Sequence, residues 1–495
     1  MKDVLAHYLN MQRSIKLSTH NDDVISGFKT GQQATKLEAG TMSLRSVIFQ
    51  NMTNMAPAAA IVYDFPLQIA AAGAALWIAN GVSMIAVLLV ASSIVQFARK
   101  MPSAGGYYTY LSRSLGSTAG AFSGWIYFLY ALILPAEVTI IWAGIASSMA
   151  DQYLHVNIHW AIFEILMIGI VVALAYTGVR RSLRVTLIAG ALEIAIFVAL
   201  GIALFAKPNS AIDFGALVPS ASPTGWSGIL GFGVVFGILN FVGFESAAPM
   251  AEETDNPRRN IPRAIMISVI ILGSLYFVMS FATVFGWGIP DLANFISDPA
   301  PFDTLANRVF GIGGLIIFFA ITNSSLACAL ATINQGSRVL MSMGRNGLVS
   351  SKLAEVHPTH RTPATAVGFI GGVTLLIALV SGFKYGTVTA FGITATTLTV
   401  GAMVVYALGN IGVIRYFTTT AKADFNALYH VVLPVTAVGL LGYVLYKCVL
   451  PMPAYPFNLP LFIAGAWMVL GLVLIAWART SRPAGFAAVM KEEIG

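Results

Sequence analysis

Apolar residues run through this chain in stretches long enough to cross a bilayer, and short polar segments separate them. The runs at 73–98, 119–150, 160–177 and 183–205 each approach or exceed the roughly 20 residues that a spanning helix needs. Because lipid offers the backbone no hydrogen-bond partners, such runs must be helical. The pattern predicts an all-α integral membrane fold with twelve helices. Their expected bounds are 44–70, 73–98, 119–150, 159–177, 181–205, 228–250, 262–287, 311–341, 363–382, 387–415, 428–449 and 459–478.

Two of the predicted helices, the first and the sixth, carry residues that interrupt a helix near mid-membrane. In the first, Pro57 removes a backbone donor and its ring clashes with the carbonyl of Thr53, so the helix must kink or open. In the sixth, Gly243 lies mid-span between Gly237 and Pro249. Opened backbone is tolerated in a bilayer only where protein or a water-filled cavity satisfies it. Simple packing kinks are the alternative, since proline and glycine are common in membrane helices.

The two interruptions lie five helices apart, which is typical of transporters built from inverted repeats. Residues 44–205 would form repeat one (helices 1–5), residues 228–415 would form repeat two (helices 6–10), and residues 428–478 would add helices 11 and 12. Residues 1–43 and 479–495 are then tails. The half-helix ends meet near the midplane, where freed N–H groups can receive a carboxylate and freed carbonyls an ammonium. A zwitterion satisfies both, so an amino acid is the expected cargo.

Composition and charge support a multi-pass membrane protein. The chain is 57% hydrophobic and 10% charged, whereas soluble domains carry about 25% charged residues. A net charge of +7 could suggest nucleic-acid binding, but its distribution follows the positive-inside rule instead. With the N-terminus inside, the only lysines and arginines assigned to the outer side are Lys207, Arg308, Lys384 and Lys447. We therefore expect both termini to be cytoplasmic and the location to be the cytoplasmic membrane of a prokaryote.

Several features of the sequence exclude other classes of protein. Cys328 and Cys448 both fall in apolar segments, so neither a disulfide framework nor a metal site is expected. The seven histidines are scattered and no nucleophile constellation accompanies them, which argues against an enzyme. A channel or nutrient sensor stays an alternative, although the tails are short for a signalling domain. The expected partners are a small-molecule substrate and the bilayer, and the sequence does not define an oligomeric state.

Three segments resemble the amino acid–polyamine–organocation superfamily of secondary transporters. The strongest match is F-V-G-F-E-S-A-A-P-M-A-E-E-T-D-N-P-R-R-N-I-P-R-A-I, from Phe241 to Ile265, which is similar to the sixth-helix signature of that family. P-S-A-G-G-Y-Y-T-Y, from Pro102 to Tyr110, is similar to its loop after helix 2. The third segment runs from Ser337 to Leu348. The resemblance covers residues from about 44 to 420 and implies the leucine-transporter-type fold, a 5+5 inverted repeat with helices 1 and 6 broken.

The resemblance also implies a substrate site at the two breaks. Relatives often carry Gly-x-Gly-Ile in the first helix, whereas this chain has three alanines before Ile61, which leaves less room for close backbone approach. The N–H groups expected to bind a substrate carboxylate are those of Ala58, Ala59 and Ala60. The carbonyls expected to bind an amine are those of Leu239, Asn240 and Val242. The aromatic residues expected to close the pocket are Phe241 or Phe244. The Asn240 side chain either contributes to selectivity or makes an interhelical hydrogen bond.

Glu193 and a serine pair are the candidates for ion coupling. Placing an ionisable residue at mid-membrane costs about 2.5–3.5 kcal/mol on insertion scales. Burial disfavours the charged form of a carboxylate, so Glu193 could exchange a proton or neutralise a sodium ion; a structural role is the alternative. Some proton-coupled relatives have a lysine at this place in the fifth helix. Ser324 and Ser325 lie where sodium-coupled relatives have ligands, but serines also pack helices together. We favour proton coupling over sodium coupling, with ion-independent exchange third, and expect no other cofactor.

Two further acids are candidates for the pocket or the gate. Glu137, beside Pro135 in the third helix, could attract a second substrate amine or be stabilised by a neighbouring helix. Glu245 resembles the sixth-helix glutamate of the family and is expected at the inner gate. A polyamine or organic-amine carrier is the alternative to an amino acid transporter. Such a carrier would need several pocket carboxylates and no receptor for a substrate carboxylate, and Glu137 is the obvious candidate acid.

Overall fold

The computed structural model is all-helical over the residues that it describes. The described residues are 42–103, 105–178, 183–345, 350–360 and 362–481. Within them the only β-type pairing is a single bridge between Met42 and Thr254. The all-α prediction is therefore confirmed, whereas the predicted tails 1–43 and 479–495 lie almost entirely outside the described residues.

Ten helical segments of the described chain are long and apolar enough to cross a membrane. They are Leu44–Lys100, Ser117–Leu154 (α7), Trp160–Thr177 (α8), Gly225–Ala251, Pro257–Trp287 (α12), Gly313–Met341 (in α15, Gly313–Arg345), Ala364–Tyr385 (α16), Thr387–Thr419 (α17), Leu428–Val449 (containing α18, Leu433–Val449) and Leu459–Ser481 (α19). The chain is thus a multi-pass membrane protein. The counts of twelve crossings and of two inverted repeats stay predictions.

The first of these segments, Leu44–Lys100, contains two successive helices. Gly73, with φ 57° and ψ −135°, ends α4 (Phe65–Ala72), and α5 (Leu76–Lys100) begins three residues later. A positive φ is readily adopted by glycine and is a common helix stop. The predicted fifth helix is present as α9 (Leu183–Ala206). Its segment Gly190–Ala206 is apolar but shorter than the ten spanning segments.

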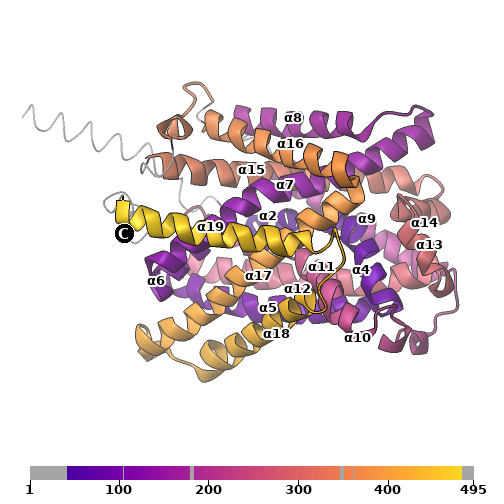
Figure 1. Cartoon of the computed structure of the whole chain (residues 1–495). Helices are drawn as coiled ribbons and strands as arrows, with labels where there is room; N and C mark the ends of the chain where they lie inside the picture. The colour runs from indigo at the N-terminus through magenta and orange to yellow at the C-terminus, as the bar shows by residue number, and fades with distance from the viewer. Residues whose placement is uncertain (1–41, 104, 179–182, 346–349, 361, 482–495) are drawn as a thin grey trace, which may run out of the picture.

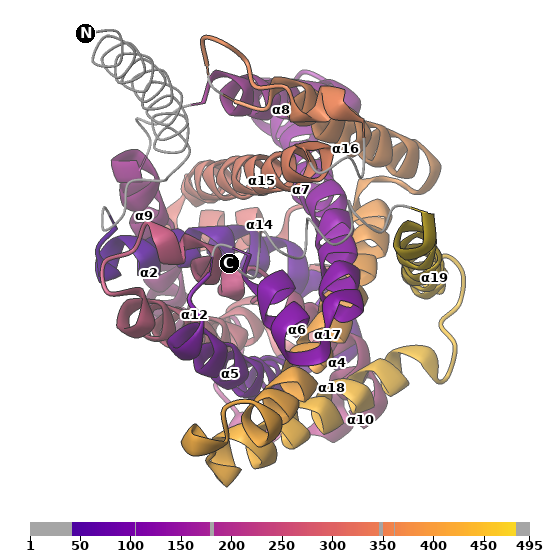
Figure 2. The same cartoon turned by 90° about the vertical axis from the view of Figure 1, so that its left-hand side faces the viewer.

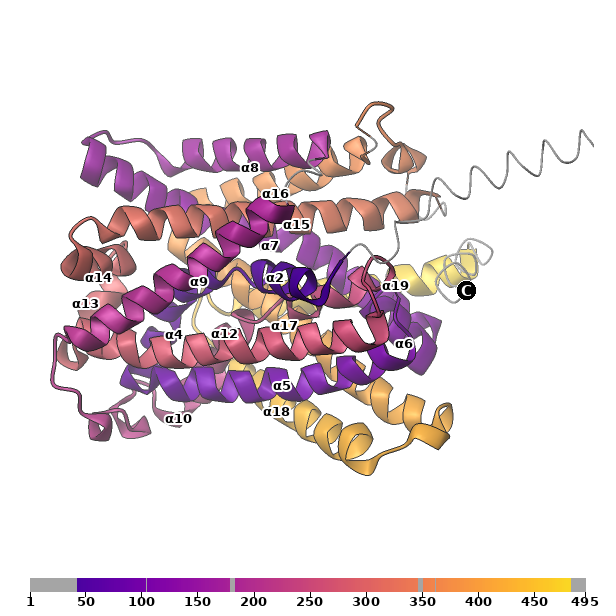
Figure 3. The same cartoon turned by 180° about the vertical axis from the view of Figure 1, so that it is seen from behind.

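The helices form a bundle in which α7 is central. It packs against α15, α17, α16 and α8, while α5 packs against α12 on the opposite side. Figure 1 shows α8, α15 and α16 as one layer and α5, α12 and α18 as another, and Figure 2 shows the same bundle along its length. From behind, α9 crosses obliquely over the bundle (Figure 3), where it contacts α2 (Leu44–Asn54), α12 and α15.

Both predicted helix interruptions are present. The first predicted helix is interrupted between α2 and α3 (Pro57–Ala59). The interruption arises because Ala56 adopts a left-handed conformation with φ 45° and ψ 63°. Pro57 stands at the first helical position, where its missing N–H costs nothing. A π-helical turn, η1 (Ala60–Asp64), then joins α3 to α4.

The second interruption lies between α11 (Val234–Leu239) and the 3₁₀ helix η7 (Phe244–Glu252). Gly243 makes the turn with φ 100° and ψ −6°, a conformation that strains any residue with a side chain. A Cβ atom there would lie 3.0 Å from the carbonyl oxygen of Asn54, at the end of α2. The two breaks are therefore in direct contact.

Candidate functional site

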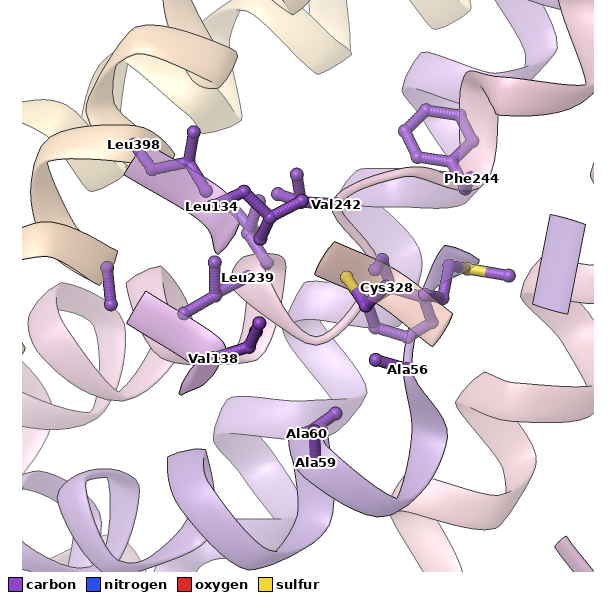
Figure 4. Close-up of a cluster of buried hydrophobic side chains, with 14 of the residues drawn as sticks. Ala56, Ala59, Ala60, Leu134, Val138, Leu239, Val242, Phe244, Cys328 and Leu398 are labelled. Carbon is purple, nitrogen blue, oxygen red and sulfur yellow. The ribbon is translucent and has the colours of Figure 1, made fainter. Parts of the chain in front are cut away.

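A small cavity lies where the two breaks meet α7, α15 and α17. Its volume is about 30 Å³, and since one water needs about 10–15 Å³ on this measure, it holds roughly two waters. Its lining residues are Asn54, Met55, Ala56, Ala59, Ala60, Tyr63, Asp64, Leu134, Val138, Leu239, Val242, Cys328 and Phe391. We call it the central cavity. Figure 4 shows how several of these side chains converge from different helices.

The structure brings four of the eight predicted substrate-binding residues to this cavity. Ala59, Ala60, Leu239 and Val242 line it. The other four are not part of the cavity lining, although each is close in the sequence to a residue that is; they are Ala58, Asn240, Phe241 and Phe244. Both phenylalanines are fully buried and face different helices. The ring of Phe241 packs edge-on against Tyr276 of α12, and that of Phe244 packs against Tyr406 of α17.

The backbone N–H groups expected to bind a carboxylate already have acceptors within the protein. The carboxylate of Glu193 lies close to the Ala58 N–H. The Ala59 N–H donates to Ser324 Oγ at 3.4 Å, and the Ala60 N–H donates to the Ala56 carbonyl at 2.9 Å. A substrate carboxylate could bind these groups only by displacing the acceptors that the protein supplies.

Glu193 and Ser324, two of the three predicted ion-coupling residues, lie together. The Glu193 carboxylate accepts a hydrogen bond from the side chain of Asn323 and lies close to the Ser324 hydroxyl and the Ala58 N–H. This cluster joins α9, α15 and the break in the first helix. Ser325 faces elsewhere, and its hydroxyl lies 2.8 Å from that of Tyr63. Sequence reasoning missed Asn323, although it directly precedes the serine pair.

Two buried carboxylates stand beside the central cavity. Asp64 lines it, is 4% exposed, and has no hydrogen-bond partner for Oδ1 among the described residues. Glu137 lies on α7 between Leu134 and Val138, which both line the cavity; it is 2% exposed, and its Oε2 likewise lacks a partner within the described chain. The two carboxylates are close enough to repel each other. Sequence reasoning missed Asp64, although an acid seven residues after Pro57 within an apolar run was a visible signal.

Asp64 also adjoins a cluster of buried amides. In one orientation of its amide, Asn240 donates to Asn80 Oδ1 at 3.0 Å. In the other, it donates to Asp64 Oδ2 at 2.8 Å and accepts from Gln68 Nε2 at 3.1 Å. Asn80 in turn donates to Gln68 and to Ser280 of α12. Asn240 therefore makes the interhelical hydrogen bond that was one of its two predicted roles.

A much larger cavity of about 440 Å³, which we call the vestibule, opens at one end of the bundle. Gly243 and Glu245 from the second break, Tyr130 of α7 and Arg338 of α15 contribute to its lining. Asn54 lines both the vestibule and the central cavity, so the two are neighbours. The vestibule lies toward the end that carries α6 (Tyr107–Leu115), on the left in Figure 1.

Glu245 ties the second break to the helices around the vestibule. Its Oε1 accepts from the hydroxyl of Tyr127 on α7 at 3.0 Å. The hydroxyl of Tyr406 on α17 lies 3.2 Å from Oε1 and 3.1 Å from Oε2. These contacts hold η7 against two long helices beside the vestibule, which is where the resemblance places a gate.

Comparison with known proteins identifies the family. A family model described as amino acid permease matches residues 46–476, which is most of the chain. The chain belongs to the amino acid permease family. The family and its relatives are transporters, so the prediction that this permease is not an enzyme is confirmed.

Several curated relatives of the permease are known by their substrates. The branched-chain amino acid permease BcaP of Bacillus subtilis is 27% identical over 62% of this chain and 67% of that protein. The low-affinity putrescine importer PlaP of Escherichia coli is 28% identical over 69% of this chain and 73% of the importer. The methylthioribose transporter of Bacillus subtilis is 26% identical over 76% and 81% respectively. Relatives at similar identity thus carry chemically different solutes.

Proposed function

We propose that this permease is a secondary transporter that carries a small amine, either an amino acid or a related organic amine, through the central cavity by alternating access. The observation that carries the proposal is the position of this cavity, at the contact of two interrupted helices and next to a vestibule open at one end. Interrupted helices supply backbone that can change conformation at the midplane. On this proposal the twelve predicted crossings form two inverted repeats.

The sizes of the two cavities support alternating access. The central cavity of about 30 Å³ is too small for any amino acid, so the surrounding helices must separate before a substrate binds. The vestibule of about 440 Å³ offers a route from one side. The distribution of lysine and arginine predicts that this side is cytoplasmic, in a cytoplasmic membrane. Ala56 and Gly243, the two residues with positive φ at the breaks, are the proposed hinges.

Proton coupling at Glu193 is part of the proposal. The Asn323 side chain donates to its carboxylate, and the Ser324 hydroxyl and the Ala58 N–H lie close to it. A proton on that carboxylate would remove acceptor capacity and weaken the link between α9, α15 and the first break. A sodium ion would need oxygen acceptors where these donors point. This arrangement supports a proton rather than sodium as the coupling ion.

The test is uptake into proteoliposomes that hold either a proton gradient or a sodium gradient. We expect a proton gradient alone to drive accumulation of at least one amino acid or amine. Glu193→Gln should abolish accumulation while leaving exchange across a gradient-free membrane. Glu164→Gln is the matched control, because Glu164 is about as buried as Glu193 but lies on α8 and accepts a hydrogen bond from Thr139 of α7 at 2.8 Å instead of one from α15.

Two results would overturn this proposal. Absence of uptake for every amino acid and amine tested would overturn the transport function itself. Accumulation driven by sodium and unchanged in Glu193→Gln would overturn the coupling and favour the sodium alternative at Ser324.

A further inference from the structure

Three buried amide side chains lie between Asp64 and α12. They belong to Gln68 of α4, Asn80 of α5 and Asn240 at the end of α11, and each is at most 1% exposed. The Asn80 nitrogen donates to Gln68 Oε1 at 3.0 Å and to the Ser280 hydroxyl of α12 at 2.9 Å. These two bonds fix the Asn80 amide, so its Oδ1 faces Asn240. Because Gln68 Oε1 accepts from Asn80, Gln68 presents its Nε2 to Asn240.

One end of the Asn240 amide lies between an acceptor and a donor. It is 3.0 Å from Asn80 Oδ1 and 3.1 Å from Gln68 Nε2. If the amide nitrogen occupies this end, it donates to Asn80. If the amide oxygen occupies it, the oxygen accepts from Gln68. Each orientation satisfies one partner and opposes the other, so this end does not decide which way Asn240 points.

The other end of the Asn240 amide faces Asp64. It lies 2.8 Å from Asp64 Oδ2 and 3.3 Å from the carbonyl oxygen of Phe236. An ionised carboxylate only accepts hydrogen bonds, whereas a protonated one also donates through its O–H. Ionised Asp64 therefore requires the amide nitrogen at this end, while protonated Asp64 can donate to the amide oxygen. The charge on Asp64 decides the orientation of Asn240.

Nothing cationic fixes the charge on Asp64. Among the described residues, no lysine, arginine or histidine lines the central cavity, and Asp64 Oδ1 has no hydrogen-bond partner. The titratable groups around Asp64 are Tyr63 of η1, Glu137 of α7, Tyr276 of α12 and Cys328 of α15. None of them supplies a positive charge. A buried carboxylate without a cationic partner is costly in its charged form, so a proton is a ready partner for it.

We propose that Asp64 is a second proton site of the permease and that Asn240 changes its hydrogen-bond partner with the charge on Asp64. When Asp64 is ionised, Asn240 donates to Asp64 Oδ2 and accepts from Gln68, which ties the end of α11 to α4. When a proton binds Oδ2, Asp64 donates it to the amide oxygen, and Asn240 donates to Asn80 of α5 instead. One proton thus moves a hydrogen bond of the second break from α4 to α5. The inference deepens the proposed proton coupling, and it rests on the proposed function for its role in transport.

The test is infrared spectroscopy of the purified permease as the pH is varied. The carbonyl stretch of a protonated carboxylic acid is separate from that of a carboxylate, so Asp64 is the titrating band that Asp64→Asn removes. Gln68→Met removes the donor that the ionised state uses, and the midpoint of this band should move to higher pH. Asn80→Leu removes the acceptor that the protonated state uses, and the midpoint should move to lower pH. Each shift should be about half a pH unit or more, the effect of one net hydrogen bond.

Asn410→Leu is the matched control. Asn410 is a fully buried amide of α17 that accepts from Ser93 at 2.7 Å, and its loss should leave the Asp64 midpoint unchanged. A further check needs neither amide variant: in wild type labelled with ¹³C-asparagine, a side-chain amide band should change together with the Asp64 band. The inference is wrong if Asp64→Asn removes no titrating band, if the asparagine bands do not change with it, or if Gln68→Met and Asn80→Leu move the midpoint in the same direction.

This inference and the proposed function can fail separately, because the infrared titration requires no transport. If the two midpoints move in opposite directions but a proton gradient drives no uptake, the proton site stands and the proposed coupling fails. If a proton gradient drives uptake and no Asp64 band titrates, the coupling stands and this inference is wrong. If both hold, the pH profile of uptake should shift in the same direction as the band in each variant.

Discussion

Replacing Gly243 by alanine should damage the second helix break in a way that can be worked out from the structure. With φ 100°, this position lies where residues with a Cβ pay about 1–2 kcal/mol. The added methyl group would also stand 3.0 Å from both the carbonyl oxygen and the side-chain nitrogen of Asn54. Overpacking of this kind costs typically about 1–3 kcal/mol, because the backbone carbonyl cannot rotate away as a flexible side chain can. Together the two effects predict a destabilisation of about 2–5 kcal/mol.

The assay is thermal unfolding in detergent together with uptake into proteoliposomes. A penalty of about 3 kcal/mol lowers the population of this conformation by a factor of about 150 relative to any competing one, so both stability and uptake should fall. Gly439→Ala is the control, since this α18 residue has nothing within 4 Å of the added methyl group. That change should be neutral or stabilising by up to about 1 kcal/mol. Equal stability and equal uptake in the two variants would refute the reasoning.

Two further substitutions test the gate and the surface. Glu245→Gln keeps the size of the side chain but removes the charge that strengthens its bonds from Tyr127 and Tyr406, so uptake should fall about tenfold in folded protein; unchanged uptake would exclude Glu245 from the gate. Lys100→Met breaks the ion pair in which Lys100 lies 2.5 Å from Asp424. Because these two side chains are 38% and 47% exposed, the free energy of unfolding should fall by at most about 1 kcal/mol. The difference in stability from wild type should vanish in high salt, because salt screens interactions between exposed charges. A loss of stability that persists in high salt would contradict the interpretation of Lys100 and Asp424 as a surface ion pair.

The sequence predicted the features of the fold that depend on local chemistry. The length of the apolar runs predicted where helices lie. Pro57 and Gly243 marked the two breaks because proline removes a helix hydrogen bond and glycine readily adopts a positive φ. The seventh helix begins at Pro257 rather than at residue 262, since Asn256, with φ 46°, turns the chain just before it and Pro257 suits its first position. Composition alone did not show that boundary.

The details of the site depend on contacts between distant segments. The Ala58 N–H was expected to face a substrate, but Glu193 of α9 reaches it across more than a hundred residues of sequence. Asp64 was missed because its place on the cavity wall follows from the π-helical turn that ends there, which rotates the rest of the helix relative to regular α geometry. Glu137 was singled out as an intramembrane acid, and its proximity to Asp64 could not be read from spacing.

The central claim is that the substrate binds in the cavity between the two breaks, and the permease carries its own probe for that claim. Cys328 lines the cavity, while Cys448 is buried in α18 and serves as an internal control. Both thiols can be followed by mass spectrometry during reaction with a small maleimide in proteoliposomes. A saturating amount of the amino acid or amine that gives uptake should slow modification of Cys328 at least fivefold and leave Cys448 unchanged. Equal rates at Cys328 with and without that substrate would contradict the account.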